Sequence, residues 1–257
     1  MVRSIALFVG CMLCAAGAHD ARAAAVAAAA ADSGRDTSLV RLGATTAYVS
    51  WPAGKAEAPA VVVVHEWWGL NTQIRSVARR LSQEGYIAIV PDLYHGKVAD
   101  DPELAHELSR GLDENKAVGD LDAAVSWLRT QPRVGKQKIG VVGFCMGGRF
   151  SQLLALKSPQ ISAAVMFYGR PETDPAVLAR LRAPLLGHFG ATDQGIGADQ
   201  TDALKAGLAR AGKVGDVFVY AGAGHAFMNE TRPSFHADAS KLAWARTLQF
   251  FQKYLKS

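Results

Sequence analysis

One cysteine stands at the centre of the stretch GFCMG, residues 143–147, between an apolar run and a helical pattern. The spacing matches the strand–turn–helix in which many enzymes hold a nucleophile, with a glycine two residues to either side of it. Those glycines leave room for the strained backbone of a sharp turn. The turn would place Cys145 at the positive end of the next helix, which favours a reactive thiolate. A buried, inert cysteine beside a tight turn is the alternative interpretation.

A cysteine nucleophile needs a base, and the base needs a group that orients it. His225 follows the last predicted strand in AGAGHAFMN, and Asp193 follows the strand before it in FGATDQGIG. The chain order of cysteine, aspartate and histidine is the order that α/β-hydrolases use. Asp174 is a rival for the acid because it also follows a strand, although TDP is typical of a helix start. We therefore predict that Cys145, Asp193 and His225 act together.

The rest of the chain alternates between apolar strands and amphipathic helices. Runs such as AVVVVHE are typical of strands that are buried on both faces. The predicted strands cover residues 60–66, 86–94, 137–145, 161–169, 183–193 and 216–225, with 45–52 as an edge strand. The predicted helices cover residues 72–85, 101–111, 113–132, 147–157, 201–212 and 236–257. This alternation predicts an α/β fold with a mostly parallel central sheet and helices on both faces.

Polar residues follow several of these strands. In an open α/β sheet, ligands bind at the carboxyl ends of the strands. Glu66, Tyr94, Cys145, Asp193 and His225 each stand at or just after the end of a predicted strand. We therefore expect these five side chains to gather at one edge of the sheet.

The first residues carry an export pattern. A basic start, the apolar stretch IALFVGCMLCAAGA and the sequence ARA predict a signal peptide over residues 1–23. The Ala-rich residues 24–36 are predicted as a flexible lead-in, and residues 37–257 as a single domain. We expect an exported protein, periplasmic or secreted, without stable membrane insertion after cleavage. Cys145 is then the one cysteine of the mature chain, in a compartment where cysteines usually pair.

Composition and motifs exclude several other classes. The net charge of +5 comes from scattered Lys and Arg residues, whereas nucleic-acid binding needs clustered charge, so none is predicted. After residue 23 there is no HxH, HExxH or CxxC spacing, and we predict no metal site. GxGxxG and phosphate-binding loops are also missing, so we predict no cofactor. The expected partner is a small-molecule substrate, and the expected assembly is a monomer or small homo-oligomer.

The stretches HEWWG, PDLYHG, GFCMGGR, GATD and GHAF occur in the order and spacing found in the dienelactone hydrolases, also called carboxymethylenebutenolidases. The chain resembles this cysteine-using branch of the α/β-hydrolase fold over most of its length. The resemblance implies that Cys145 is the nucleophile, His225 the base and Asp193 the orienting acid. It also implies that Glu66 contacts the resting thiol and helps to generate the thiolate.

The same resemblance implies the surroundings of the thiol. The backbone N–H groups of Met146 and Trp67 would form the oxyanion hole. Apart from the resemblance, the aromatic residues themselves suggest a cleft with apolar walls, lined by Trp67 and by the predicted substrate contacts Tyr94, Trp68 and Phe227. They could equally be ordinary core residues, as most aromatic side chains are.

The chain departs from the family's best-known members where they bind a substrate carboxylate. Asn229 in HAFMN stands in the place of an arginine that helps to hold this group. A second arginine and a tyrosine of those members have no clear match: aligning on Asp101 and Pro102 puts Leu108 and Leu112 in their places, with Arg110 nearby. The resemblance therefore implies ester or lactone hydrolysis and leaves open whether the substrate is anionic.

Two other functions are consistent with parts of the sequence. A redox thiol protein of the cell envelope would need a partner thiol, because the mature chain has no second cysteine. A non-catalytic binding protein could retain the fold, since a fold does not determine a function. The ordered cysteine, aspartate and histidine favour an enzyme over both.

Overall fold

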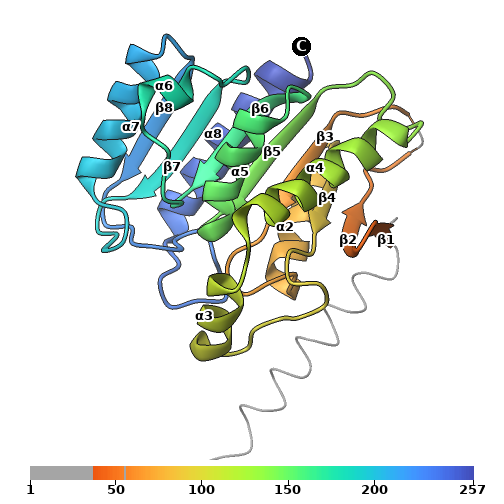
Figure 1. Cartoon of the computed structure of the whole chain (residues 1–257), viewed down its shortest axis with the longest axis horizontal. Helices are drawn as coiled ribbons and strands as arrows, with labels where there is room; N and C mark the ends of the chain where they lie inside the picture. The colour runs from red at the N-terminus through yellow and green to blue at the C-terminus, as the bar shows by residue number, and fades with distance from the viewer. Residues whose placement is uncertain (1–36, 55) are drawn as a thin grey trace, which may run out of the picture. The chain divides into compact units, whose positions relative to one another are not determined.

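The computed structural model describes residues 37–54 and 56–257, and an eight-stranded sheet forms the centre of this part (Figure 1). The strands are β1 Thr37–Leu42, β2 Thr45–Ser50, β3 Ala60–Val64, β4 Ile87–Pro91, β5 Ile139–Phe144, β6 Ile161–Phe167, β7 Leu185–Gly190 and β8 Gly215–Tyr220. Their order is β1-β2-β4-β3-β5-β6-β7-β8. The pairs β1–β2 and β2–β4 are antiparallel, and the other pairs are parallel. The predicted signal peptide (1–23) and lead-in (24–36) lie outside the described residues.

Helices cover both faces of the sheet. They are α2 Thr72–Gln83, α3 Pro102–Arg110, α4 Glu114–Thr130, α5 Met146–Lys157, α6 Pro175–Leu178, α7 Ala198–Arg210 and α8 Ala237–Leu255. Residues of α4, α5 and α7 share one hydrophobic core with the sheet, and residues of α2 and α8 share another. Figure 1 shows α4 and α5 in front of the strands and α8 behind them. The prediction of a mostly parallel sheet with helices on both faces is confirmed.

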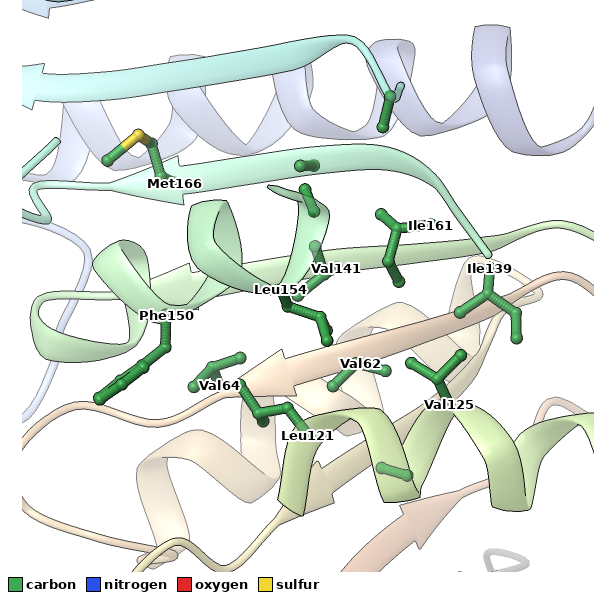
Figure 2. Close-up of a cluster of buried hydrophobic side chains, with 14 of the residues drawn as sticks. Val62, Val64, Leu121, Val125, Ile139, Val141, Phe150, Leu154, Ile161 and Met166 are labelled. Carbon is green, nitrogen blue, oxygen red and sulfur yellow. The ribbon is translucent and has the colours of Figure 1, made fainter. Parts of the chain in front are cut away.

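The central strands are buried on both faces because successive side chains enter different cores. Val62 and Val64 of β3 belong to the core under α4 and α5, whereas Val61 and Val63 belong to the core under α2 and α8. All four side chains are fully buried. Figure 2 shows Val62 and Val64 beside Leu121 of α4. A continuous β-branched run is therefore what a strand at this position requires.

One edge of the sheet differs from the prediction. The expectation that residues 45–52 form an edge strand is wrong, because β2 lies between β1 and β4. Gly43, with φ of 60°, begins the short turn that joins β1 to β2. The true edge strand, β1, has a mixed sequence and leaves Leu39 65% exposed. Such a strand lacks the apolar run by which the inner strands are visible in the sequence.

The parallel strands deliver polar residues to the same edge of the sheet. Glu66 follows β3, Cys145 follows β5 and Tyr168 follows β6. Asp193 follows β7, and His225 follows β8. Because β3, β5, β6, β7 and β8 are neighbours in the sheet, the loops after them form one continuous surface at its carboxyl edge.

Candidate active site

Cys145 lies in a strained turn between β5 and α5. Its backbone has φ of 53° and ψ of −120°, and few residues other than glycine adopt a positive φ. A Cβ atom on Gly143 would collide with the carbonyl oxygen of Gly147, and one on Gly147 would collide with that of Val64. The two glycines therefore allow this turn to pack against the end of β3. The thiol of Cys145 is left partly exposed.

Replacing Gly143 with alanine is expected to lower the free energy of unfolding by about 3 kcal/mol or more, because the backbone must move to admit a Cβ. Gly119→Ala in α4 is the matched control, since nothing lies within 4 Å of a Cβ at that position. Alanine there should stabilise the helix by roughly 0.5–1 kcal/mol. Urea unfolding measures both changes, and equal stability of the two variants would contradict the explanation of Gly143.

Three side chains from three loops form one hydrogen-bonded row. His225 Nε2 lies 3.1 Å from Cys145 Sγ, and His225 Nδ1 lies 2.7 Å from Asp193 Oδ2. The other oxygen of Asp193 accepts hydrogen bonds from the N–H groups of Gly195 and Ile196, at 2.8 and 3.1 Å. Its side chain is fully buried, so these contacts hold it in one orientation. The structure thus brings together the cysteine, the histidine and the acid that the sequence indicates.

The charges in this row stabilise one another. Burial by itself lowers the pKa of His225, but the hydrogen bonds and charges of Asp193 and Cys145 outweigh it and raise the pKa to about 10. Burial raises the pKa of Asp193, but the hydrogen bond and charge of His225, together with the N–H groups of Gly195 and Ile196, outweigh it, so the pKa is lowered. An imidazolium between the carboxylate and the sulfur is therefore favoured near neutral pH.

This pairing predicts that the contribution of His225 to stability depends on pH. Because the pKa rises from 6.5 to about 10 on folding, the stabilisation is fully present below pH 6.5 and is lost as the pH rises through about 10. The difference in unfolding free energy between wild type and His225→Gln should shrink over this window. Urea unfolding at a series of pH values measures this difference. A difference that stays constant with pH would speak against the pairing.

The carboxyl group of Glu66 is buried near this row, at 4% exposure. The hydroxyl of Tyr168 donates a hydrogen bond to Oε1 at 3.1 Å, and Asn229 Nδ2 donates one to Oε2 at 2.6 Å. Burial raises the pKa of Glu66, although both hydrogen bonds act in the opposite direction. Within the described chain no hydrogen bond joins Glu66 to Cys145, whose sulfur bonds to His225. The structure therefore shows no hydrogen bond for the contact with the resting thiol that the sequence resemblance implies, and the role of Glu66 in forming the thiolate stays a prediction.

The two backbone N–H groups assigned to an oxyanion hole lie in neighbouring segments. Met146 is the first residue of α5, and Trp67 follows Glu66 in the loop after β3. Neither N–H donates a hydrogen bond to another group in residues 37–54 and 56–257. An N–H in the first helical turn also carries the positive end of the helix dipole. Both donors are thus free to bind an anion, and their assignment stays a prediction.

Of the three aromatic residues expected in a cleft, Tyr94 lies beside the turn of Cys145, whereas Trp68 packs against Trp67 and Arg232. The hydroxyl of Tyr94 is 3.5 Å from Sδ of Met146, next to the turn of Cys145. Burial, followed by the charge of Cys145, raises the pKa of Tyr94, so its phenol stays protonated. Trp68 is 6% exposed and packs under the guanidinium of Arg232 at 3.5 Å. Of these two residues, Tyr94 is the one that contacts the turn of Cys145.

Phe227 belongs to the core. It has no exposed surface, and its ring centroid lies 5.3 Å from Tyr168, 5.3 Å from Tyr220 and 6.2 Å from Phe167. A side chain enclosed by other rings does not line a cleft, so the interpretation of Phe227 as a substrate contact needs correction. Its ring anchors the loop that carries His225.

Asp174, the rival for the acid, has a structural role. It is exposed, and its carboxylate accepts a hydrogen bond from the N–H of Ala176 at 2.8 Å, at the start of α6. This is the helix cap that the sequence TDP indicates. The structure gives His225 a hydrogen bond to Asp193 and none to Asp174 within the described residues.

Tyr168 is the site residue that the sequence interpretation missed. It is 1% exposed, has φ of 38°, and follows the buried strand β6 directly. Its ring packs edge-on against the ring of His225, with centroids 5.2 Å apart. The available signal was its position, because a polar tip at the carboxyl end of a buried strand lies where such sheets bind ligands.

The part of the chain that the structure describes has no helix that is long and apolar enough to cross a membrane. The same residues contain no group of three His, Cys, Asp or Glu side chains that could hold a metal ion. Asp193 and His225 bond to each other, and His225 also bonds to Cys145.

Comparison with known proteins gives relatives over most of the chain. A family model described as "Dienelactone hydrolase family" matches residues 45–255. A Methylorubrum extorquens protein assigned as a carboxymethylenebutenolidase is 35% identical over 226 residues, which are 82% of this chain and 78% of that one. A Klebsiella pneumoniae crystal structure assigned as a dienelactone hydrolase has a TM-score of 0.78 at 32% identity, over 85% of this chain and 98% of that one. The predicted α/β-hydrolase fold is thereby confirmed.

Proposed function

The chain belongs to the dienelactone hydrolase family, and on this premise we propose that it cleaves a small ester or lactone through an acyl-enzyme on Cys145. The observation that carries the proposal is the row of Cys145, His225 and Asp193, joined at 3.1 and 2.7 Å. A structural cysteine has no need of an imidazole that a buried carboxylate orients. A nucleophilic thiolate needs both.

The first half of the reaction forms a thioester. His225 holds the proton of the thiol, and the thiolate of Cys145 attacks the acyl carbon. The carbonyl oxygen becomes an oxyanion, which the N–H groups of Met146 and Trp67 stabilise. When the oxyanion collapses, the ester C–O bond breaks and His225 gives its proton to the departing alkoxide. The alcohol leaves, and the acyl group stays on Cys145.

The second half restores the thiol. His225, now neutral, takes a proton from a water molecule as the water oxygen attacks the thioester. Collapse of the second oxyanion breaks the C–S bond, so the acid leaves and the thiolate of Cys145 forms again beside the imidazolium. Asp193 holds the imidazole in the required tautomer and stabilises its positive charge in both halves.

The surroundings support a substrate that does not depend on a carboxylate for binding. The side-chain amide of Asn229 donates a hydrogen bond to the carboxyl group of Glu66 and not to a site for a substrate carboxylate. Leu108 and Leu112 lie in a hollow of about 520 Å³ that Tyr94 also lines. The hollow has charged residues of both signs, and Cys145 and His225 are not part of its lining. We therefore expect a neutral aryl ester to be hydrolysed at least as fast as a matched ester that carries a carboxylate. Steady-state kcat/KM for the two esters measures this preference, and a clear preference for the anion would contradict it.

A rapid-quench experiment tests the acyl-enzyme. The protein is mixed with excess p-nitrophenyl acetate, quenched in acid within the first turnover, and digested for mass spectrometry. The expected result is one acetyl group on the peptide that contains Cys145, removable by hydroxylamine. Cys145→Ala should show neither the acetyl group nor the burst of nitrophenol. A burst of nitrophenol in wild type with the acetyl group on another residue would contradict the proposal.

We also propose that the protein is exported and that its mature form begins near Ala24. The support is the basic start, apolar stretch and small-residue sequence within residues 1–23. The intact mass of the protein from a periplasmic or culture-medium fraction should lack these residues. Protein that keeps them and stays in the cytoplasmic fraction would refute the proposal.

A further inference from the structure

Glu66 belongs to a network that none of the steps above uses. Its carboxyl joins its own loop after β3 to Tyr168 after β6 and to Asn229 after β8. Asn229 lies in the loop that carries His225, and its amide oxygen accepts from the N–H and the hydroxyl of Thr231, at 3.1 and 2.7 Å. Tyr168 packs edge-on against His225. One buried carboxyl therefore ties together three loops of the site.

The backbone of Glu66 is held as firmly as its side chain. Its carbonyl oxygen bonds to Nδ1 of His65 at 2.6 Å and accepts from the N–H of Gly69 at 3.1 Å. His65 Nε2 accepts from the N–H of Leu93 at 3.2 Å, which leaves Nδ1 as the donor. Burial lowers the pKa of His65, so the ring is neutral, as this pattern requires. The peptide plane that follows Glu66 therefore has one orientation.

That peptide plane carries the N–H of Trp67. In a trans peptide the N–H points away from the carbonyl, so the contacts that hold the carbonyl of Glu66 also aim this N–H. We propose that Glu66, held by Tyr168 and Asn229, is a positioning residue that aims the N–H of Trp67 at the oxyanion. The inference rests on the proposed acyl-enzyme function and assigns Glu66 a task within it.

This task differs from activation of the thiol. The sulfur of Cys145 already bonds to His225, and the carboxyl of Glu66 already bonds to two donors of its own. Moving Glu66 to the sulfur would leave the amide of Asn229 and the hydroxyl of Tyr168 buried without their acceptor, at a cost in free energy. The geometry therefore favours a carboxyl that stays in place during turnover.

Two reactions of the same sulfur separate positioning from activation. Acylation of Cys145 by an aryl ester passes through an oxyanion. Alkylation by iodoacetamide does not, because the thiolate displaces iodide at a saturated carbon. Tyr168→Phe removes one donor and keeps the ring, and Glu66→Gln leaves a single oxygen for two donors. Both variants should lower the acylation rate roughly 10- to 100-fold and leave the alkylation rate within about twofold.

The matched control is Tyr48→Phe. Tyr48 is 4% exposed, and its hydroxyl has no hydrogen-bond partner within the residues described, so both rates should match wild type. A parallel fall of acylation and alkylation in Tyr168→Phe would overturn the proposal and assign the network to thiol activation. Unchanged acylation in Tyr168→Phe and Glu66→Gln would overturn it as well. If the wild-type protein never forms the acyl group on Cys145, the proposed acyl-enzyme itself is wrong. This result differs from each of the outcomes above.

Discussion

Replacing Cys145 with alanine is expected to lower kcat/KM for a small aryl ester by roughly 10⁴-fold or more. The loss is large because Cys145 is the only nucleophile hydrogen-bonded to His225 Nε2 within the residues that the structure describes. Ser151, in helix α5, is fully buried. Its hydroxyl donates hydrogen bonds to the carbonyl oxygens of Gly148 and Val165, at 2.7 and 3.0 Å. In Cys145→Ala, His225 has no thiol from which to take a proton. Hydrolysis then depends on direct attack by water, and the oxyanion donors are the main remaining assistance.

Cys145→Ser is the companion variant. Its hydroxyl keeps the position beside His225 Nε2, which lies 3.1 Å from the sulfur in wild type. We expect weak hydrolysis that exceeds that of the alanine variant, because the base and the turn are preserved. Initial rates at matched protein concentration measure all three forms, and thermal unfolding checks their fold. An alanine variant that kept more than about a tenth of wild-type activity would end the acyl-enzyme hypothesis.

Asp193→Asn is expected to lower kcat/KM by roughly 10³- to 10⁴-fold. An amide at 2.7 Å from His225 Nδ1 can present its NH₂ group there, which favours the tautomer with the proton on Nε2. That tautomer cannot accept the proton of the thiol. The amide also removes the negative charge that helps to raise the pKa of His225, so the imidazolium is less stable.

Asp174→Asn is the control for this substitution. Asparagine caps helices as well as aspartate does, and Asp174 bonds to the N–H of Ala176 at 2.8 Å, so activity should match wild type. The pH profile of kcat/KM adds a second measurement, because the loss of the Asp193 charge should move the ionisation of His225 to lower pH. Comparable activities for the two variants would remove Asp193 from the mechanism.

Much of the fold follows from local patterns in the sequence. The run AVVVVHE predicts a strand that is buried on both faces, and β3 is one, with Val61 to Val64 divided between two cores. The pattern fails at β1, since a short strand with one exposed face has no apolar run. The turn at Cys145 is predictable for a related reason. Gly143 and Gly147, which leave room for the turn, lie only two residues to either side of Cys145 in the sequence.

Local patterns were enough to predict the inner strands and the helices that alternate with them, the sharp turn around Cys145, and the three residues of the hydrogen-bonded row. These features depend on periodicity and on neighbours a few residues apart. The folded arrangement of the loops was needed to see that Phe227 is buried in the core and that Glu66 bonds to Tyr168 and Asn229, which are 102 and 163 residues away. A buried carboxyl bonds to the donors that the surrounding loops bring to it, and no local pattern encodes the paths of those loops.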